Sequence, residues 1–175
     1  KGHMTLEEAI KTAIQYEAKV RDVYAQAVKD IADPAAQRML KVLADEEHRH
    51  VEYLHSKRLE WETTGKITVR ELASVIPPKE VIAKGISDLK SRVTERDSSA
   101  YTEEIQILRN ALDMEVETSN FYKRMVKELK AEGQQMFSRF VEIEEGHEAI
   151  VQAQIDALSG MGFWFDSCEF DLEAG

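Results

Sequence analysis

Cysteine is almost absent from this chain, which has a single thiol, Cys168, among 175 residues. One cysteine excludes an intrachain disulfide framework and the cysteine-rich knuckles that bind iron or zinc. No apolar run reaches the roughly 18 residues of a membrane span, and no charged-then-apolar leader opens the chain, so we predict neither a membrane partner nor a signal peptide. A reducing cytoplasm is therefore the location we expect.

Proline and glycine are scarce too, at three and eight residues, whereas hydrophobic residues make up 43% and charged residues 32%. This balance is typical of a helix-rich globular protein, and the length allows one domain with a sizeable core. Basic residues are in deficit, at 23 against 33 acidic ones, which leaves a formal net charge of −10. We therefore predict no nucleic-acid partner. Attraction of cations fits the charge, although acidic surfaces often only keep a protein in solution.

Apolar residues recur at helical spacing in four long segments. The Thr5 hydroxyl can cap the first helix, and Glu8 lies at the position that completes a capping box. Asp33 and Pro34 are residue types that favour the start of the second helix. The predicted helices span residues 5–31, 34–65, 102–130 and 134–160, the last of them following Gly133.

The link between the second and third helices, residues 66–101, is much longer than the other two links. Its Pro77-Pro78 pair breaks a helix, and residues 79–93 have the pattern of a shorter one. A long link can cross the length of a bundle, whereas short links join neighbouring helices. We therefore predict an all-α fold, a four-helix bundle of two helical hairpins joined by a long crossover.

The bundle is predicted to form one domain over residues 5–158. Residues 1–4, with the sequence KGHM, resemble a cloning remnant, so we assign them no role in the fold. The tail, residues 159–175, is aromatic but not periodic. We expect it either to cover one end of the bundle or to contact another subunit.

Each apolar stripe is interrupted by polar residues at positions that should face the core. Buried polar groups cost free energy unless something compensates them. Residues three apart on a helix lie about 60° apart around the axis and roughly 4.5 Å along it, so a Glu-x-x-His pair can reach one point. The interrupting residues are Glu17 in the first helix, Glu47 and His50 in the second, Glu115 in the third, and Glu144 and His147 in the fourth.

These interruptions belong to a two-fold internal repeat. Residues 13–24, AIQYEAKVRDVY, align with residues 111–122, ALDMEVETSNFY, at a shift of 98 positions. Residues 46–50, EEHRH, align with residues 143–147, IEEGH, at a shift of 97 positions. The repeat therefore retains the polar core residues as well as the apolar ones, which is the strongest signal in the chain.

A single Glu-x-x-His pair is usually solvated surface, and an isolated histidine on an apolar face is usually a satisfied core residue. Four buried carboxylates close together are different, because they repel one another and some would have to stay protonated. A pair of divalent cations would balance the four negative charges, and the two imidazoles would complete the coordination. We therefore predict a dinuclear metal site. Carboxylate and imidazole ligands suit iron or manganese, and zinc could occupy the same site.

One glutamate from each of two helices and a Glu-x-x-His from each of the other two is a pattern that resembles the ferritin-like di-iron carboxylate proteins. The resemblance is closest to rubrerythrin-type domains and covers nearly all of residues 5–158. It implies terminal ligands at Glu17 and Glu115, bridging carboxylates at Glu47 and Glu144, one nitrogen ligand per metal at His50 and His147, and tyrosines just outside the ligand set at Tyr24 and Tyr122. Simple core packing is the alternative interpretation of the two tyrosines.

The chain departs from full-length rubrerythrins in two ways. Those proteins add a rubredoxin module with four cysteine ligands, which one cysteine cannot build, so an external electron donor such as a rubredoxin-like protein is expected. They also carry a second glutamate one turn beyond the first on the third helix. Thr118 holds that place here, and Glu117 lies one residue off the buried face, so we expect the plain six-ligand set.

The resemblance implies an oxidoreductase with two iron ions per chain that reduces hydrogen peroxide, or dioxygen, in oxidative stress defence. Two alternatives stay open. One is an iron-handling protein that oxidises and stores iron inside an oligomeric shell, and the other is a manganese catalase-like dismutase. We expect a homodimer or a larger homo-oligomer.

Overall fold

The computed structural model describes residues 2–70, 72–92 and 101–165. Within these ranges every regular element is helical, which confirms the predicted all-α class for the described part of the chain. Parts of the predicted crossover (93–100) and tail (166–175) lie outside the described residues. The helices are α1 (Leu6–Asp30), α2 (Pro34–Thr64), α3 (Lys79–Arg92), α4 (Thr102–Glu128) and α5 (Ala131–Gly160).

The ends of α1 and α2 follow from local side-chain chemistry. The Thr5 hydroxyl accepts the Glu8 backbone N–H while the Glu8 carboxylate accepts the Thr5 backbone N–H at 2.8 Å, so the predicted capping box is present. Asp33 caps α2 ahead of Pro34. The helix ends at Thr64 and is capped by Gly65, whose φ of 70° is a conformation that glycine adopts without steric cost.

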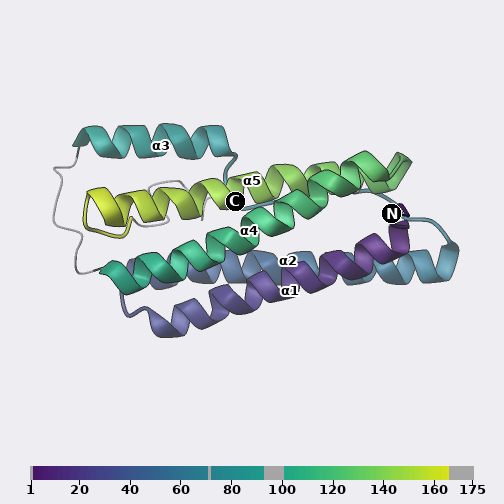
Figure 1. Ribbon diagram of the computed structural model, residues 1–175, viewed down its shortest axis with the longest axis horizontal. Coiled ribbons are helices and arrows are strands. Elements are labelled where there is room, and N and C mark those ends of the chain that lie inside the picture. The colour runs from purple at the N-terminus through teal and green to yellow at the C-terminus, as the bar shows by residue number, and fades with distance from the viewer. Residues whose placement is uncertain (1, 71, 93–100, 166–175) are drawn as a thin grey trace.

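The long helices pack as two pairs, α1 with α2 and α4 with α5 (Figure 1). Residues 31–33 and 129–130 are the only links within these pairs, so each pair is an antiparallel hairpin. Helix α1 also packs against α4, which joins the two hairpins into one helical bundle, and α3 lies against α5.

Helix α5 begins at Ala131, three residues before the predicted start at residue 134. Gly133 therefore lies inside the helix and does not form the turn before it. A Cβ atom at this glycine would come within 3.0 Å of the Leu6 side chain, so the missing side chain allows α5 and the start of α1 to approach closely.

The core consists of two apolar clusters separated by a polar layer. One cluster contains Val20, Tyr24, Leu40, Leu43, Leu108, Ile150, Val151 and other buried residues, and the second contains Ile10, Leu54, Tyr122, Met125, Phe137, Phe140 and others. Along each long helix the buried glutamates and histidines come between members of the two clusters. The apolar layers therefore keep the polar layer away from water on both sides.

The described part of the tail folds back onto the first cluster. Trp164 and Phe165 are 6% and 1% exposed, and the Gln154 side-chain amide donates to the Phe165 carbonyl at 3.0 Å. Residues 161–165 thus pack against the first cluster, while residues 166–175 of the predicted tail lie outside the described residues. None of the described helices is long and apolar enough to cross a membrane.

Candidate metal centre

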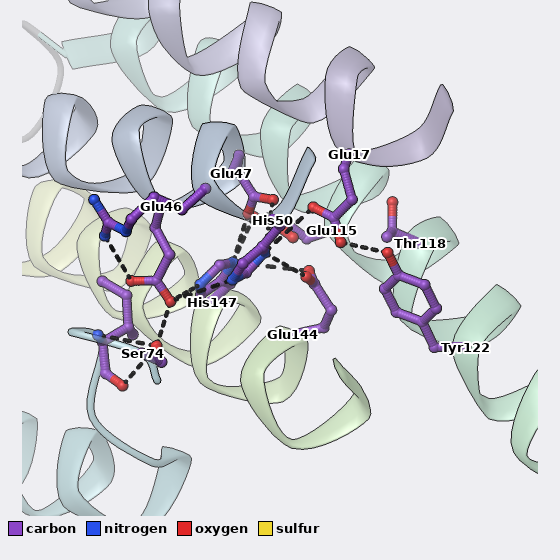
Figure 2. A network of polar contacts seen from close by, with 12 residues as sticks. Glu17, Glu46, Glu47, His50, Ser74, Glu115, Thr118, Tyr122, Glu144 and His147 are labelled. Atoms are coloured by element: carbon purple, nitrogen blue, oxygen red, sulfur yellow. Dashed lines mark hydrogen bonds and ion pairs between the residues drawn. The ribbon is translucent and has the colours of Figure 1, made fainter. Parts of the chain in front are cut away.

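The bundle brings together all six residues that interrupt the apolar stripes (Figure 2). They come from the middle turns of four different helices and meet in the polar layer. None is more than 1% exposed; the six are Glu17 from α1, Glu47 and His50 from α2, Glu115 from α4, and Glu144 and His147 from α5.

The six residues form two overlapping groups, each able to hold a metal ion. Within each group every residue offers one ligand atom, and these atoms lie within 4.8 Å of one another. Glu47 and Glu144 belong to both groups, so the two possible cation positions are adjacent and share two carboxylates. The first group is Glu17, Glu47, His50 and Glu144, and the second is Glu47, Glu115, Glu144 and His147.

Both histidines direct the Nδ1 atom toward the carboxylates. His50 Nδ1 lies 3.5 Å from Glu17 Oε2 and 3.4 Å from Glu47 Oε2. His147 Nδ1 lies 2.6 Å from Glu47 Oε1 and 3.5 Å from Glu115 Oε1. The two rings are nearly parallel, at an interplanar angle of 5° with centroids 5.7 Å apart. The hairpins therefore present their imidazoles in equivalent ways.

The two predicted tyrosines reach across the bundle to the opposite hairpin. The Tyr24 hydroxyl on α1 donates to Glu115 Oε1 on α4 at 2.6 Å, and the Tyr122 hydroxyl on α4 donates to Glu17 Oε1 on α1. Burial, together with the nearby carboxylate charges, raises the pKa of both hydroxyls well above the usual value, so they stay protonated and donate. Core packing alone would not give the hydroxyls these partners.

Most of the inward-facing atoms of the cluster have no hydrogen-bond partner in the protein. A buried polar atom without a partner costs roughly 1–3 kcal/mol, so such a concentration of them calls for a ligand. The donor set of carboxylate oxygens and imidazole nitrogens fits hard or borderline divalent cations. The inward-facing atoms without a partner are Glu17 Oε2, Glu115 Oε2, Glu47 Oε2, both carboxylate oxygens of Glu144, and His50 Nδ1.

The same crowding retains protons when no cation is bound. Burial and the charges of Glu17 and Glu115 raise the pKa of Glu47 and of Glu144 well above the usual value. Burial opposes a charge on His50, but the Glu17 and Glu47 carboxylates together outweigh it and raise the His50 pKa to about 10. Two divalent cations would compensate the four carboxylate charges without any of these protons.

Glu46 is a buried member of this network that the sequence reasoning missed. It is 1% exposed, and its Oε1 atom lies 3.1 Å from His147 Nε2 and 3.8 Å from His50 Nε2 (Figure 2). One carboxylate thus faces the outer nitrogen of both rings. A proton on His147 Nε2 would donate to this carboxylate and leave Nδ1 to bind a metal ion.

The sequence contains one indication that Glu46 is buried, its spacing from His50, but the internal repeat does not support it. Glu46 lies four residues before His50 and therefore on the same side of α2. In the repeat, however, it aligns with Ile143, so it is not among the polar residues that both halves share.

The structure also shows the surroundings of Thr118, which holds the place of the second glutamate that rubrerythrins carry on this helix. Thr118 is fully buried, and its hydroxyl donates to the Met114 carbonyl of the same helix at 2.8 Å. Glu117 is exposed on the outside of α4. Neither residue belongs to the two groups of candidate ligands.

Comparison with protein-family models, with curated proteins and with solved structures found no match. The interpretation of function therefore depends on the chemistry of this cluster.

Proposed function

We propose that this protein is a ferritin-like, rubrerythrin-type oxidoreductase that binds two iron ions per chain and reduces hydrogen peroxide. The observation that carries the proposal is the set of six buried carboxylates and imidazoles, most of whose inward atoms lack hydrogen-bond partners. The order of the helices, two hairpins joined by a long link, supports the same assignment.

Each of the two groups would hold one iron ion, with Glu47 and Glu144 shared between them. Two iron(II) ions bound there would supply the two electrons that, with two protons, convert one hydrogen peroxide molecule into two water molecules. Manganese is the main competitor for such a donor set, and zinc can also bind to it.

The residues around the cluster orient it and limit access. Tyr24 and Tyr122 each hold one oxygen of a glutamate, which leaves the second oxygen free to bind a metal ion. Phe140 packs edge-on against the His50 ring at a centroid distance of 5.4 Å. All of the candidate ligands are buried, which favours a small oxidant over a large organic substrate.

The proposal includes an external electron donor, because a single cysteine cannot form a rubredoxin module. A rubredoxin-like protein is the donor that the rubrerythrin resemblance implies. A homodimer or larger homo-oligomer, and function in the cytoplasm, remain predictions.

The test combines metal content with reactivity. Protein loaded anaerobically with iron(II) should retain about two irons per chain. Stopped-flow absorbance should then record fast, stoichiometric oxidation by one equivalent of hydrogen peroxide, and slower oxidation by dioxygen. Continued turnover should require an added reductant.

Two outcomes would replace this proposal with another function. Faster reaction with dioxygen, together with hundreds of irons mineralised per particle, would establish iron storage. Peroxide dismutation by the manganese-loaded protein, without any added reductant, would establish a catalase-like activity.

A further inference from the structure

The crossover reaches the metal centre through a short segment that we call the strap, residues 72–78. The Ser74 hydroxyl donates to Glu46 Oε1, and the Val75 backbone N–H donates to Glu46 Oε2 at 3.2 Å (Figure 2). Glu46 Oε1 is the same oxygen that lies 3.1 Å from His147 Nε2. A continuous chain of hydrogen bonds therefore leads from the strap to a candidate metal ligand.

The strap is also seated directly on α5 beside that ligand. The Pro77 carbonyl oxygen would lie 3.0 Å from a Cβ atom placed on Gly146, the residue before His147. Because Gly146 has no side chain, the strap backbone can rest against the helix at this point. Arg139 anchors the start of the strap by donating to the Leu72 carbonyl at 2.8 Å.

The end of the strap is anchored as well, because Lys79, the first residue of α3, pairs with Glu145 of α5 at 2.7 Å. Ser74 and Ile76 are further joined within the strap, since the Ile76 N–H donates to the Ser74 hydroxyl at 3.2 Å. The Ser74 hydroxyl is thus held at the position from which it contacts Glu46.

We propose that Ser74 is a positioning residue of the metal centre, which orients Glu46 and through it His147. Two strap donors and one imidazole occupy the two oxygens of Glu46, so the carboxylate has little freedom to rotate. Ile143 stands at the repeat position in α5, so Glu46 has no carboxylate counterpart in the other half of the repeat. Groups that hold metal-binding imidazoles in place affect metal affinity without touching the metal.

Docking of the strap and binding of the metal are consequently coupled. If the docked strap strengthens metal binding by a given factor, bound metal strengthens docking by the same factor. The Val75 amide reports on docking because its N–H bonds to Glu46. The Thr68 amide is a matched control, since its N–H bonds at 2.6 Å to Glu60, a carboxylate that is not part of the cluster.

The inference rests on the proposed metal site but not on the proposed reaction, so its test uses cobalt(II) and zinc(II) binding without any oxidant. Affinity is measured by competition with a chelator, and amide exchange is measured with and without metal. Ser74→Ala should weaken binding by about tenfold, the lower end of the range for partners of metal ligands. Ser74→Thr should restore most of the affinity because it keeps the hydroxyl.

Ser56→Ala is the control substitution, because the Ser56 hydroxyl donates to the Tyr53 carbonyl on the exposed side of α2 and Ser56 is not part of the cluster. It should leave the affinity unchanged. In the unmodified protein, bound metal should slow exchange of the Val75 amide and leave that of the Thr68 amide as it was. In Ser74→Ala the metal-dependent slowing at Val75 should be reduced.

Glu46→Gln gives a second route to the same answer if Ser74→Ala does not fold, because the amide keeps the volume and loses one acceptor. It should weaken binding by roughly 10- to 100-fold. Equal affinities for the unmodified protein and these variants, with no effect of metal on the Val75 amide, would overturn the role of Ser74 and leave the metal site standing. Failure of the unmodified protein to bind either metal would overturn both proposals.

Discussion

The two hairpins contribute equally to the inward face of the cluster and unequally to the layer behind it. Each supplies one glutamate, one Glu-x-x-His pair and one tyrosine that crosses to the other hairpin. Behind the imidazoles, however, α2 supplies Glu46 whereas α5 has Ile143 at the matching position. The residues that would contact metal are thus present in both halves, whereas a carboxylate behind the imidazoles is present in one half and hydrogen-bonds His147 alone.

The two sides of the cluster also have different surroundings. On one side, the rings of Tyr122, Phe137 and Phe140 pack together with centroids 5.0–6.3 Å apart and form an apolar wall. On the other side lies the strap, with a pocket of about 370 Å³ between it and α5, lined by Ser74 and Gly146 among others. The Ser74–Glu46 contact thus lies on the side of this pocket, whereas Tyr24 and Tyr122 hold their glutamates from within the core.

The largest effect is expected from the two shared carboxylates. Glu47→Ala and Glu144→Ala should each abolish the rise in melting temperature that metal causes, because each residue belongs to both groups. At a metal concentration a hundred times the Kd, that rise should be about 5–10 °C for a chain of this size. Calorimetry with and without zinc(II) measures it. Exposed Glu117→Ala should retain the full rise, and a full rise in both shared-carboxylate variants would refute the ligand assignment.

Next in size are substitutions of residues that belong to one group only. His50→Ala and His147→Ala should each lower the bound iron from about two to about one per chain, because each removes the only imidazole of its group. Both variants, and Glu115→Ala, should lose the fast reaction with peroxide. Elemental analysis and stopped-flow absorbance test this. If only the variants of one hairpin lost bound iron and the fast reaction with peroxide, the two halves would not be equivalent.

Smaller effects are expected from the crossing tyrosines. Tyr24→Phe and Tyr122→Phe each remove a hydrogen bond to a buried carboxylate, which should cost roughly 1.5–3 kcal/mol of the free energy of unfolding. Metal content should stay unchanged, because neither tyrosine is a ligand in the proposed set. Urea denaturation of the metal-free proteins gives the comparison. Costs below about 0.5 kcal/mol for both would mean that these hydroxyl contacts do not stabilise the fold.

The smallest effect concerns pH. The His50 pKa is raised to about 10 in the metal-free fold from 6.5, the ordinary value, which the unfolded chain should have. Its proton therefore stabilises the metal-free fold fully below about pH 6.5, and this contribution is lost as the pH rises toward 10. The metal-bound protein does not carry that proton, so the metal-induced rise in melting temperature should grow between about pH 6.5 and pH 8.

Two variants sharpen this measurement. The trend should be smaller in His50→Gln and unchanged in His48→Gln, since the His48 side chain is 55% exposed and lies outside both groups. A trend that is equally strong in both variants would show that His50 is not its source.

Much of the cluster could be predicted because the spacing of residues along each helix places the six side chains on buried faces. Glu17 and Glu115 fall between apolar residues of their stripes, and the repeat identifies them as counterparts before any contact is known. Glu46 was missed because neither helical spacing nor the repeat identifies its partner. Its contact with His147 joins residues 101 positions apart, and the other half of the repeat has no counterpart to it.

The sequence by itself determined the positions of the long helices, their buried faces and the six polar residues on those faces, because spacing along one helix decides which side chains share a face. Only the tertiary structure decided that each tyrosine bonds to the glutamate of the opposite hairpin, and that Ser74 of the strap reaches Glu46. Those contacts depend on how the helices are rotated and offset against one another and on the path of the crossover, and no periodicity within a single segment encodes either.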